Sequence, residues 1–199
     1  MNFKWLLLVG VVFTLSACTG EKEIKQEEQV EVTSTEQEEV TEQLTIGADG
    51  WVEYDHKEYT VFAPQDWEMD VTGRMNTTFI LFSPRDSKDD LFRENVNLVK
   101  EDISKMDMTL FDYVKNSESV LEQYMTDLRD LNIEQKDDRY WLTYTATQER
   151  MDLYFLQMME MNDGVIYILT YTSNDQSLSI HAQNGKRIIE RFQFNGFNL

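Results

Sequence analysis

The pattern of apolar and polar positions divides the chain into three parts. Residues 5–15 are mostly apolar, whereas residues 19–49 are mostly Glu, Gln, Thr, Lys and Val without any aromatic residue; aromatic residues resume at Trp51. A segment so poor in apolar side chains cannot offset the entropy of ordering. We therefore predict a disordered acidic tether over residues 18–49 and one folded domain over residues 50–199. A charged helix is the alternative for the tether, because Glu, Gln and Lys favour helices.

Runs of β-branched and aromatic residues predict strands in the first half of the domain. These runs are residues 51–54, 58–62, 77–83 and 95–100. Asp55-His56-Lys57, between the first two runs, has the length of a hairpin loop. Pro64 ends the second strand because its nitrogen cannot donate to a ladder, and we expect Trp67 to fold back over the core.

Two segments show helical periodicity. The first begins near Thr109, which forms a variant of the capping box with Asp112, and runs for about six turns. Its apolar stripe is Val114, Leu121, Met125 and Leu128. The second begins near Asp175, with the stripe Leu178, Ala182, Gly185, Ile189 and Phe192. Glycine costs about 1 kcal/mol relative to alanine inside a helix, so we expect Gly185 to let this helix approach the sheet closely.

Three longer strand-like runs lie between the two helices, at residues 140–148, 151–161 and 165–173. Asn162-Asp163-Gly164 joins the last two, and Asp-Gly between apolar runs is a strong hairpin signal. The order of elements is strands, helix, strands, helix. It predicts an α+β fold in which an antiparallel β-sheet is sandwiched by helices, without a second domain.

The apolar run near the N-terminus has the composition of an export signal. Lys4 precedes it, and the small residues Ser16 and Ala17 follow it. A membrane-spanning helix needs about 20 apolar residues, and this run is shorter. We therefore predict that residues 1–17 are a cleaved signal peptide.

The end of that signal, Leu15-Ser16-Ala17-Cys18, resembles the lipobox of bacterial lipoproteins, in which the cysteine becomes the lipid-modified first residue. Cys18 is the only cysteine, so it has no disulfide partner in the chain. The resemblance implies a lipid anchor on Cys18, with the protein on the extracytoplasmic face of a cell membrane, periplasmic or at the cell surface. The alternative is an ordinary secretory peptide followed by a buried cysteine.

The charge of the chain excludes one class of partner. The chain carries 37 acidic and 18 basic residues, and its formal net charge is -19. Nucleic-acid binding requires clustered Lys and Arg, and the sequence contains no basic stripe. We therefore expect no nucleic-acid partner.

The segments from Tyr59 to the C-terminus resemble the PsbP-like family, which includes many bacterial lipoproteins. Two sequence segments carry the likeness first: Tyr59-Thr60-Val61-Phe62-Ala63-Pro64 with Trp67, and then Glu94-Asn95-Val96-Asn97-Leu98-Val99. The helix from Thr109, the paired long strands and the closing helix that ends in Arg191-Phe192 follow in the same order. It implies an antiparallel sheet between helices. The motifs are mainly structural, so the resemblance carries over a fold and no functional residue.

The two histidines do not form a recognisable catalytic or metal motif. Hydrolytic triads and most zinc sites need an imidazole beside a nucleophile or further ligands. We expect His56 in an exposed hairpin loop and His181 at the flank of a core-facing helical stripe. No Gly-rich phosphate loop, HExxH or GxSxG motif is present, so we predict no enzymatic activity and no cofactor.

One loop gathers three carboxylates that could bind a hard cation such as Ca²⁺. Asp86, Asp89 and Asp90 lie within five positions, but their spacing differs from an EF-hand loop. Arg85, Lys88 and Arg93 lie among them and would repel a cation. We therefore expect a solvated loop and no metal site, with these three aspartates as the candidates otherwise.

Methionines and aromatic residues in the long strands indicate core packing. Strand alternation separates Met158 from Met159 and Met161, which argues against one soft-metal cluster there. Tyr140, Trp141, Tyr144, Tyr154 and Tyr167 likewise indicate packing within the sheet, although a solvent-facing row could form a recognition surface.

Two hypotheses for function follow. The first is a non-enzymatic binding or accessory module, anchored at a membrane by lipid and acting on another envelope protein. The alternative is a carrier or sensor that binds a small ligand or cation in a pocket between sheet and helix.

Overall fold

The structure is a computed structural model, and it describes residues 43–47, 49–90, 92–174 and 180–195. Eleven strands and two α-helices are present in these residues, together with one 3-10 helix. The strands are β1 (Gln43–Ile46), β2 (Trp51–Asp55), β3 (Tyr59–Pro64), β4 (Glu68–Asp70), β5 (Phe79–Phe82), β6 (Asn95–Asp102), β7 (Thr126–Lys136), β8 (Arg139–Gln148), β9 (Met151–Asn162), β10 (Val165–Ser173) and β11 (Gln193–Phe194). The helices are η1 (Arg74–Asn76), α1 (Leu110–Tyr124) and α2 (Ile180–Arg191).

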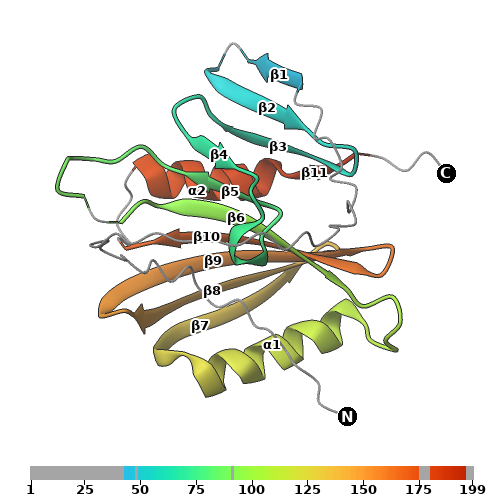
Figure 1. Cartoon of the computed structure of the whole chain (residues 1–199). Coiled ribbons are helices and arrows are strands. Elements are labelled where there is room, and N and C mark those ends of the chain that lie inside the picture. The colour runs from blue at the N-terminus through green and yellow to red at the C-terminus, as the bar shows by residue number, and fades with distance from the viewer. Residues whose placement is uncertain (1–42, 48, 91, 175–179, 196–199) are drawn as a thin grey trace, which may run out of the picture.

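The strands form two antiparallel sheets. The large sheet has seven strands in the order β4-β5-β6-β10-β9-β8-β7, and the small sheet has four in the order β1-β2-β3-β11. Helix α1 lies against one face of the large sheet, and α2 lies between the opposite face and the small sheet (Figure 1). The predicted α+β sandwich is confirmed, with a separate small sheet that the sequence did not indicate.

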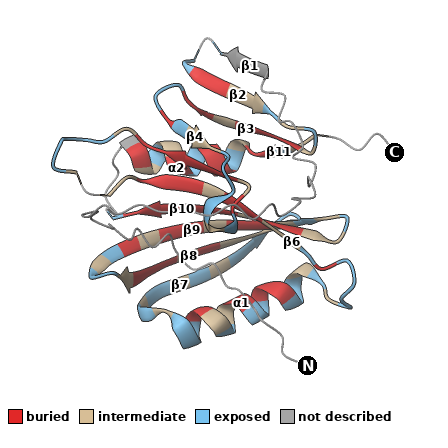
Figure 2. Ribbon diagram, in the orientation of Figure 1, coloured by how far each residue is buried: buried red, intermediate tan, exposed pale blue. Residues whose placement is uncertain are grey.

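The two faces of the large sheet carry two separate cores. Buried residues run along β5, β6, β10 and β9, as Figure 2 shows. The core on the α2 side includes Val61 from the small sheet, Leu98 and Leu169 from the large sheet, and Ile188 and Ile189 from α2. Because all three layers contribute to this core, α2 is buried on two sides.

The core on the α1 side is built from α1 and strands β8 to β10. Val114 and Leu121 of α1 contact a wall formed by the remaining buried residues. Among them are Leu142, Tyr144, Ala146, Leu153, Phe155, Met159 and Ile166. The rings of Tyr144 and Phe155 stack with their centroids 4.7 Å apart. The predicted methionine packing is confirmed for Met158 and Met159, which are buried in different cores, whereas Met161 is exposed.

The predicted hairpin between the last two long strands is confirmed. Asp163 (φ 49°) and Gly164 (φ 77°) both have positive φ, as a two-residue primed turn requires. A Cβ on Gly164 would lie 2.9 Å from the Cα of Ser104, so the turn also packs closely on the segment after β6. Glycine is needed here for conformation and for space.

The predicted close approach at Gly185 is also confirmed. A Cβ built on Gly185 would lie 2.2 Å from Cδ2 of Tyr171 on the central strand β10. Real side chains do not approach so closely. The glycine therefore sets the distance between α2 and the large sheet.

The helix predicted from Thr109 ends earlier than expected. The capping box of Thr109 and Asp112 is present, but α1 ends at Tyr124. The chain then continues as strand β7, so the placement of Met125 and Leu128 on a helical stripe was wrong.

Two irregularities in β7 explain this error. Its register on β8 shifts on both sides of Arg129, and Asp127 (φ 50°) and Asp130 (φ 54°) have positive φ. A bulge adds one residue to a strand and changes which face the following residues occupy. Leu128 and Leu131 consequently both pack against the α1-side core although they lie three residues apart. A spacing of three residues between apolar side chains is also typical of an amphipathic helix.

Several predicted boundaries shift in the structure. The small sheet begins at Gln43, inside the range that we assigned to the tether, because β1 pairs with β2. The predicted strand at 77–83 spans only Phe79–Phe82, and the strand from Asn95 extends to Asp102. The predicted start of the last helix near Asp175 and its residue Leu178 lie outside the described residues. As predicted, β3 ends at Pro64 and Trp67 is buried.

An ion pair joins the start of β3 in the small sheet to the large sheet. Lys100 Nζ of β6 lies 2.5 Å from Glu58 Oε2, and the Tyr167 hydroxyl of β10 lies 3.4 Å from the same oxygen. Partial burial raises the pKa of Glu58, but the hydrogen bond and charge of Lys100 outweigh burial and hold that pKa below its ordinary value near 4.5.

The pKa of Glu58 is lower in the folded chain than in the unfolded chain. The ionised carboxylate therefore stabilises the fold fully above about pH 4.5, and this stabilisation is lost as the pH falls through the pKa of the folded state. We expect Glu58→Gln to reduce the free energy of unfolding at pH 7 and to make little difference at pH 3. Urea unfolding of both proteins across this range measures the effect. Glu122→Gln on the exposed side of α1 is the control. A Glu58→Gln difference that stays constant with pH would contradict this assignment.

Candidate functional site

A pocket of about 80 Å³ lies between the small sheet and the β4–β5 edge of the large sheet. It is lined by Tyr54, Asp55, His56, Tyr59, Val61, Met69, Val71, Thr78 and Phe79, and we call it the inter-sheet pocket. The β2–β3 hairpin supplies one wall, and the segments of β4 and β5 supply the other. The pocket therefore exists only because the small sheet folds over this edge.

The walls of the inter-sheet pocket are mainly apolar. The polar residues of the lining are Asp55, His56 and Thr78, together with Tyr54 and Tyr59, which carry hydroxyl groups. Binding sites for drug-sized ligands occupy roughly 300 to 1,000 Å³, so this pocket can hold only a small molecule or one end of a larger one. Our second hypothesis placed a pocket between sheet and helix, whereas this pocket lies between the two sheets.

His56 lies half-buried at this pocket, so the expectation of an exposed loop histidine was wrong. Its ring stacks on Tyr59 with centroids 4.4 Å apart, and its Nδ1 accepts a hydrogen bond from the Glu58 backbone N–H at 3.2 Å. Burial, together with the Glu58 charge, raises the pKa of the Tyr59 hydroxyl far above its usual range. The Tyr59 hydroxyl therefore stays protonated.

The C-terminal segment holds the turn beside the pocket in place. Asn195 Nδ2 donates to Asp55 Oδ1 at 2.7 Å and also to the His56 carbonyl. The Thr60 hydroxyl lies 2.6 Å from Asn195 Oδ1 and 3.1 Å from Asp55 Oδ1. These contacts hold the Asp55 carboxylate beside Thr60, on the face of the small sheet opposite the Tyr59 and Val61 side chains that line the pocket.

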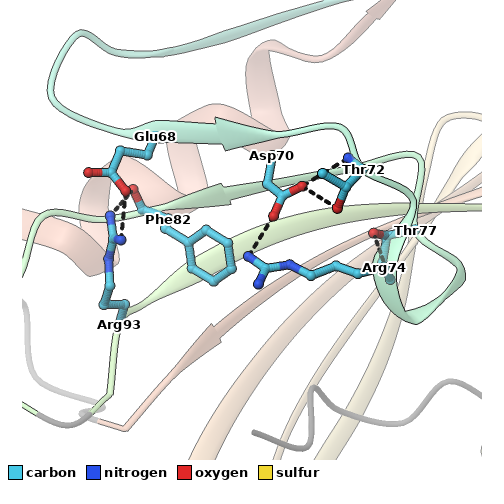
Figure 3. Close-up of polar contacts among 7 residues, drawn as sticks. All are labelled: Glu68, Asp70, Thr72, Arg74, Thr77, Phe82 and Arg93. Carbon is cyan, nitrogen blue, oxygen red and sulfur yellow. Dashed lines mark hydrogen bonds and ion pairs between the residues drawn. The ribbon is translucent and has the colours of Figure 1, made fainter. Parts of the chain in front are cut away.

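A second cluster of polar residues occupies the β4–β5 edge, shown in Figure 3. The guanidinium carbons of Arg74 and Arg93 lie 4.8 and 5.2 Å from the centroid of the Phe82 ring. Asp70 Oδ2 pairs with Arg74 at 2.7 Å, and Glu68 Oε2 pairs with Arg93 at 2.7 Å. We call these five residues the arginine surface.

A strained loop positions Arg74. Its neighbours Gly73 (φ 74°), Met75 (φ 54°) and Asn76 (φ 60°) all have positive φ. For Met and Asn this conformation costs on the order of 1 to 3 kcal/mol each, and it persists only where the surroundings enforce it.

Asp70 is the residue that holds this loop. Its Oδ1 accepts hydrogen bonds from the Thr72 backbone N–H at 2.9 Å and from the Thr72 hydroxyl at 2.7 Å, while Oδ2 pairs with Arg74 (Figure 3). The hydrogen bonds from Thr72, with a smaller effect of the Arg74 charge, lower the pKa of Asp70 against the opposing effect of burial. Asp70 is therefore an anion that organises the whole turn.

Arg93 is fixed by three acceptors. Its Nε donates to the Ser83 carbonyl at 2.6 Å, Nη2 to the Phe82 carbonyl at 3.3 Å, and Nη1 to Glu68. The arginine surface is therefore rigid on both sides of Phe82.

The three aspartates that we considered as cation ligands contact different partners, although the Asp86 backbone N–H also donates to Asp90 Oδ2 at 3.2 Å. Asp86 Oδ1 lies 2.8 Å from Nε2 of His181, and Asp90 Oδ1 accepts the backbone N–H of Phe92 at 3.1 Å. Asp89 donates its backbone N–H to Ser87. Within the described ranges, no group of three or more His, Cys, Asp or Glu is arranged to hold a metal ion.

His181 is buried, and it joins α2 to the loop after β5. The imidazole lies against Trp67 with ring centroids 6.3 Å apart, and its Nε2 pairs with Asp86. His181 and His56 lie in different parts of the molecule and share no site. The sequence placed His181 beside a core-facing stripe correctly but gave no indication of its partner.

Cys18, the predicted lipidation site, lies outside the described residues, as does the signal peptide. Among the residues that the structure describes, no helix is long and apolar enough to cross a membrane.

Neither the inter-sheet pocket nor the arginine surface was found from the sequence. The hairpin Asp55-His56-Lys57 and the charged residue Arg93 were visible in the sequence, but no pattern indicated which strand each would face. The signal available was the Gly73-Arg74-Met75-Asn76 turn, which contains the only glycine between the first hairpin and the long strands.

No family model matches the chain, and no curated protein matches it significantly in sequence. Solved structures do match in fold. The solution structure of cyanobacterial PsbP (CyanoP) from Synechocystis sp. PCC 6803 aligns with 75% of this chain and 95% of its own, with a TM-score of 0.54 and 16% identity. Protein PA94 of unknown function from Pseudomonas aeruginosa aligns with 71% of this chain and 94% of its own, with a TM-score of 0.50 and 18% identity.

The fold of this chain is therefore PsbP-like, as the sequence resemblance implied. A third structure, LpqN of Mycobacterium tuberculosis, described as involved in cell envelope biogenesis, covers 77% of this chain and 90% of its own, with a TM-score of 0.48 and 8% identity. With a TM-score below 0.5, this third match adds no argument to the first two.

Proposed function

We propose that this chain is a lipid-anchored accessory protein of the cell envelope that acts by binding another envelope protein. The observation that carries the proposal is the sequence Leu15-Ser16-Ala17-Cys18, directly after an apolar run and containing the only cysteine. Each buried CH₂ of an acyl chain contributes about 0.8 kcal/mol, and two or more chains give stable anchoring. The folded domain would then be held at the extracytoplasmic face of the membrane by lipid on Cys18.

The arginine surface is the proposed contact with the partner. Arginine and aromatic residues are enriched in protein interfaces, and a side chain fixed before binding loses little entropy on association. Arg74 is partly exposed, and Glu68, which pairs with Arg93, is 74% exposed. An exposed ion pair contributes at most about 1 kcal/mol, so a carboxylate of the partner can replace Glu68 at small cost.

Cell fractionation tests the location, and site-specific crosslinking tests the contact. The wild-type chain is expected to stay in the membrane fraction after a high-salt wash, and Cys18→Ser to appear in the supernatant. A photo-crosslinker at exposed Asp66, two residues before Glu68, should join the anchored chain to one protein reproducibly, whereas a crosslinker at exposed Phe111 on α1 should not.

Two arginine variants make the contact test specific. Arg74→Ala should abolish the Asp66 crosslink. Arg129→Ala should preserve it, because Arg129 is also an exposed arginine paired with a carboxylate, Asp152, but lies on β7 at the opposite edge of the large sheet. Membrane retention of Cys18→Ser would overturn the anchor. Equal crosslinking from Asp66 and Phe111 would overturn the contact.

The inter-sheet pocket favours a second candidate function, a carrier or sensor for a small ligand. The mainly apolar walls with a few polar groups match the general form of ligand sites. This function is compatible with the same lipid anchor.

A further inference from the structure

We propose that the outer edge of β4 binds an extended segment of the partner protein, which adds to the large sheet as one more strand. The segment has one aliphatic residue between two acidic residues. Its aliphatic side chain enters the inter-sheet pocket, and its acidic side chains face Arg74 and Arg93. The inference rests on the contact proposed above for the arginine surface, and it names the binding mode and the chemistry of the partner.

Strand β4 is the last strand of the large sheet at this end. It pairs with β5 on one side, and no strand of the described residues pairs with its other side. A strand in this position presents backbone N–H and C=O groups with which another chain can pair. Asp66 before β4 and Val71 after it are both exposed, Val71 by 47%. An extended segment can therefore approach this edge from solvent.

The two faces of β4 differ in chemistry, because successive residues of a strand point to opposite faces of the sheet. Met69 lies opposite Leu81 of the α2-side core and lines the inter-sheet pocket. Glu68 lies opposite Phe82 and therefore shares the face that carries the arginine surface. The edge of β4 thus separates a mainly apolar pocket from a pair of arginines (Figure 3).

An added strand contacts both faces at once. Its side chains alternate as those of β4 do, so the residue opposite Met69 points toward the pocket and its two neighbours point toward the arginines. Strand addition of this kind gains affinity from main-chain hydrogen bonds and specificity from pockets for alternate side chains. A helix does not fit this arrangement, because its side chains return to one face every three to four residues.

The inter-sheet pocket fits an aliphatic side chain. Its volume of about 80 Å³ is smaller than the cavity of about 150 Å³ that binds benzene. Burial of an aliphatic group against its mainly apolar walls is favourable in proportion to the area removed from water. Valine suits this position best, because β-branched residues are small enough for the pocket and favour strands.

The arginine surface fits acidic side chains. Arg74 is 42% exposed, and Glu68, which pairs with Arg93, is 74% exposed. Glu68 can turn away when a carboxylate of the partner arrives, since an exposed ion pair contributes little. Arg93 stays in place because the Ser83 and Phe82 carbonyls also hold it. Charges more than about 8 Å apart are largely screened at physiological ionic strength, so these adjacent arginines act on the segment more strongly than distant acidic residues.

Titration of the isotope-labelled full chain with synthetic pentapeptides, followed by two-dimensional NMR, tests this inference. The reference peptide is Thr-Glu-Val-Glu-Thr with blocked ends, whose pattern is the same in either strand direction. We expect it to shift resonances of β4 and of the pocket lining saturably. It should bind at least tenfold more tightly than Thr-Lys-Val-Lys-Thr, which reverses the charge, or Thr-Glu-Thr-Glu-Thr, which replaces valine by a polar residue of the same shape.

Methylation of the peptide backbone distinguishes strand addition from a contact made by side chains alone. In an added strand, the N–H groups of alternate residues point toward β4, and those between them point away. Methylation of the valine nitrogen and methylation of a glutamate nitrogen should therefore have unequal effects on the reference peptide. One should weaken binding at least tenfold, and the other should change it little.

Three variants locate the acidic side chains. Arg74→Ala should weaken the reference peptide at least fivefold. Glu68→Gln should strengthen it at least threefold, because the carboxylate that competes for Arg93 is removed, and misfolding cannot produce such a gain. Asp152→Asn removes another exposed carboxylate that pairs with an arginine, Arg129, and should leave binding unchanged. Weaker binding to Glu68→Gln would contradict the placement of an acidic side chain on Arg93.

The outcomes separate this inference from the proposed function. Equal binding of the three unmethylated pentapeptides, equal losses from the two methylations, or no shift of β4 resonances by any peptide would overturn strand addition. A crosslink from Asp66 that depends on Arg74 would in that case still support the contact. If the reference peptide bound as expected but no crosslink formed in membranes, the edge of β4 would stand as a peptide site and the envelope partner would be overturned.

Discussion

Truncation of Phe155 to alanine is expected to lower the free energy of unfolding by about 3 to 5 kcal/mol, because it removes a whole ring from a close-packed core. Phe155 is 1% exposed and lies on β9 beneath α1. Its ring stacks on Tyr144 of the neighbouring strand at 4.7 Å. Since β9 is flanked by β10 and β8 in the large sheet, the backbone cannot close the cavity.

Denaturant unfolding followed by circular dichroism measures this loss. Phe111→Ala is the matched control, because it is the same substitution at a site on α1 that is 53% exposed. Natural domains are stable by about 5 to 15 kcal/mol in total, so the Phe155 variant should unfold at much lower denaturant concentration. A Phe155 effect as small as that of Phe111 would contradict the core that we describe on the α1 side.

Substitution of Gly185 by alanine is expected to destabilise the fold by roughly 1 to 3 kcal/mol, the usual cost of overpacking a core. At an open helical position the same change would stabilise by about 1 kcal/mol, because alanine is the better helix former. A loss of stability would therefore indicate that position 185 is closely packed, and a gain would indicate that it is an open helical position. A methyl group at Gly185 would lie 2.2 Å from Tyr171, which is 1% exposed and cannot move aside.

A double-mutant cycle isolates that contact. In a Tyr171→Leu background the ring that opposes the methyl group is absent, so Gly185→Ala should become neutral or stabilising. Thermal unfolding of the four proteins provides the comparison. If alanine at position 185 stabilised the wild-type background, the close approach of α2 to β10 would be wrong.

Local sequence signals identified those parts of the fold in which a few adjacent residues decide the conformation. Asp163-Gly164 specified a turn with positive φ, Thr109 with Asp112 specified the start of α1, and Pro64 specified the end of β3. Each depends on contacts within about four residues.

The wrong helix prediction at the start of β7 shows what local sequence signals cannot identify. Apolar residues three apart, Leu128 and Leu131, are typical of a helix, yet here two bulges against β8 bring them to one face of a strand. A bulge is defined by the pairing of two strands, so the periodicity of one strand cannot reveal it. The short strands β1, β4 and β11 escaped prediction for a related reason, because pairing with a neighbour rather than their own sequence makes them strands.

The sequence by itself determined the fold class, the packing role of Gly185 and the strongly acidic charge, whereas lipidation of Cys18 stays a prediction. Only the tertiary structure decided that the small sheet covers the β4–β5 edge, and this arrangement creates the inter-sheet pocket. It also decided that Arg74 and Arg93, nineteen positions apart, flank one phenylalanine ring. Hydrophobic periodicity records which side of an element is buried, but it contains no information about which other element covers that side. Both candidate sites consist of such contacts between elements.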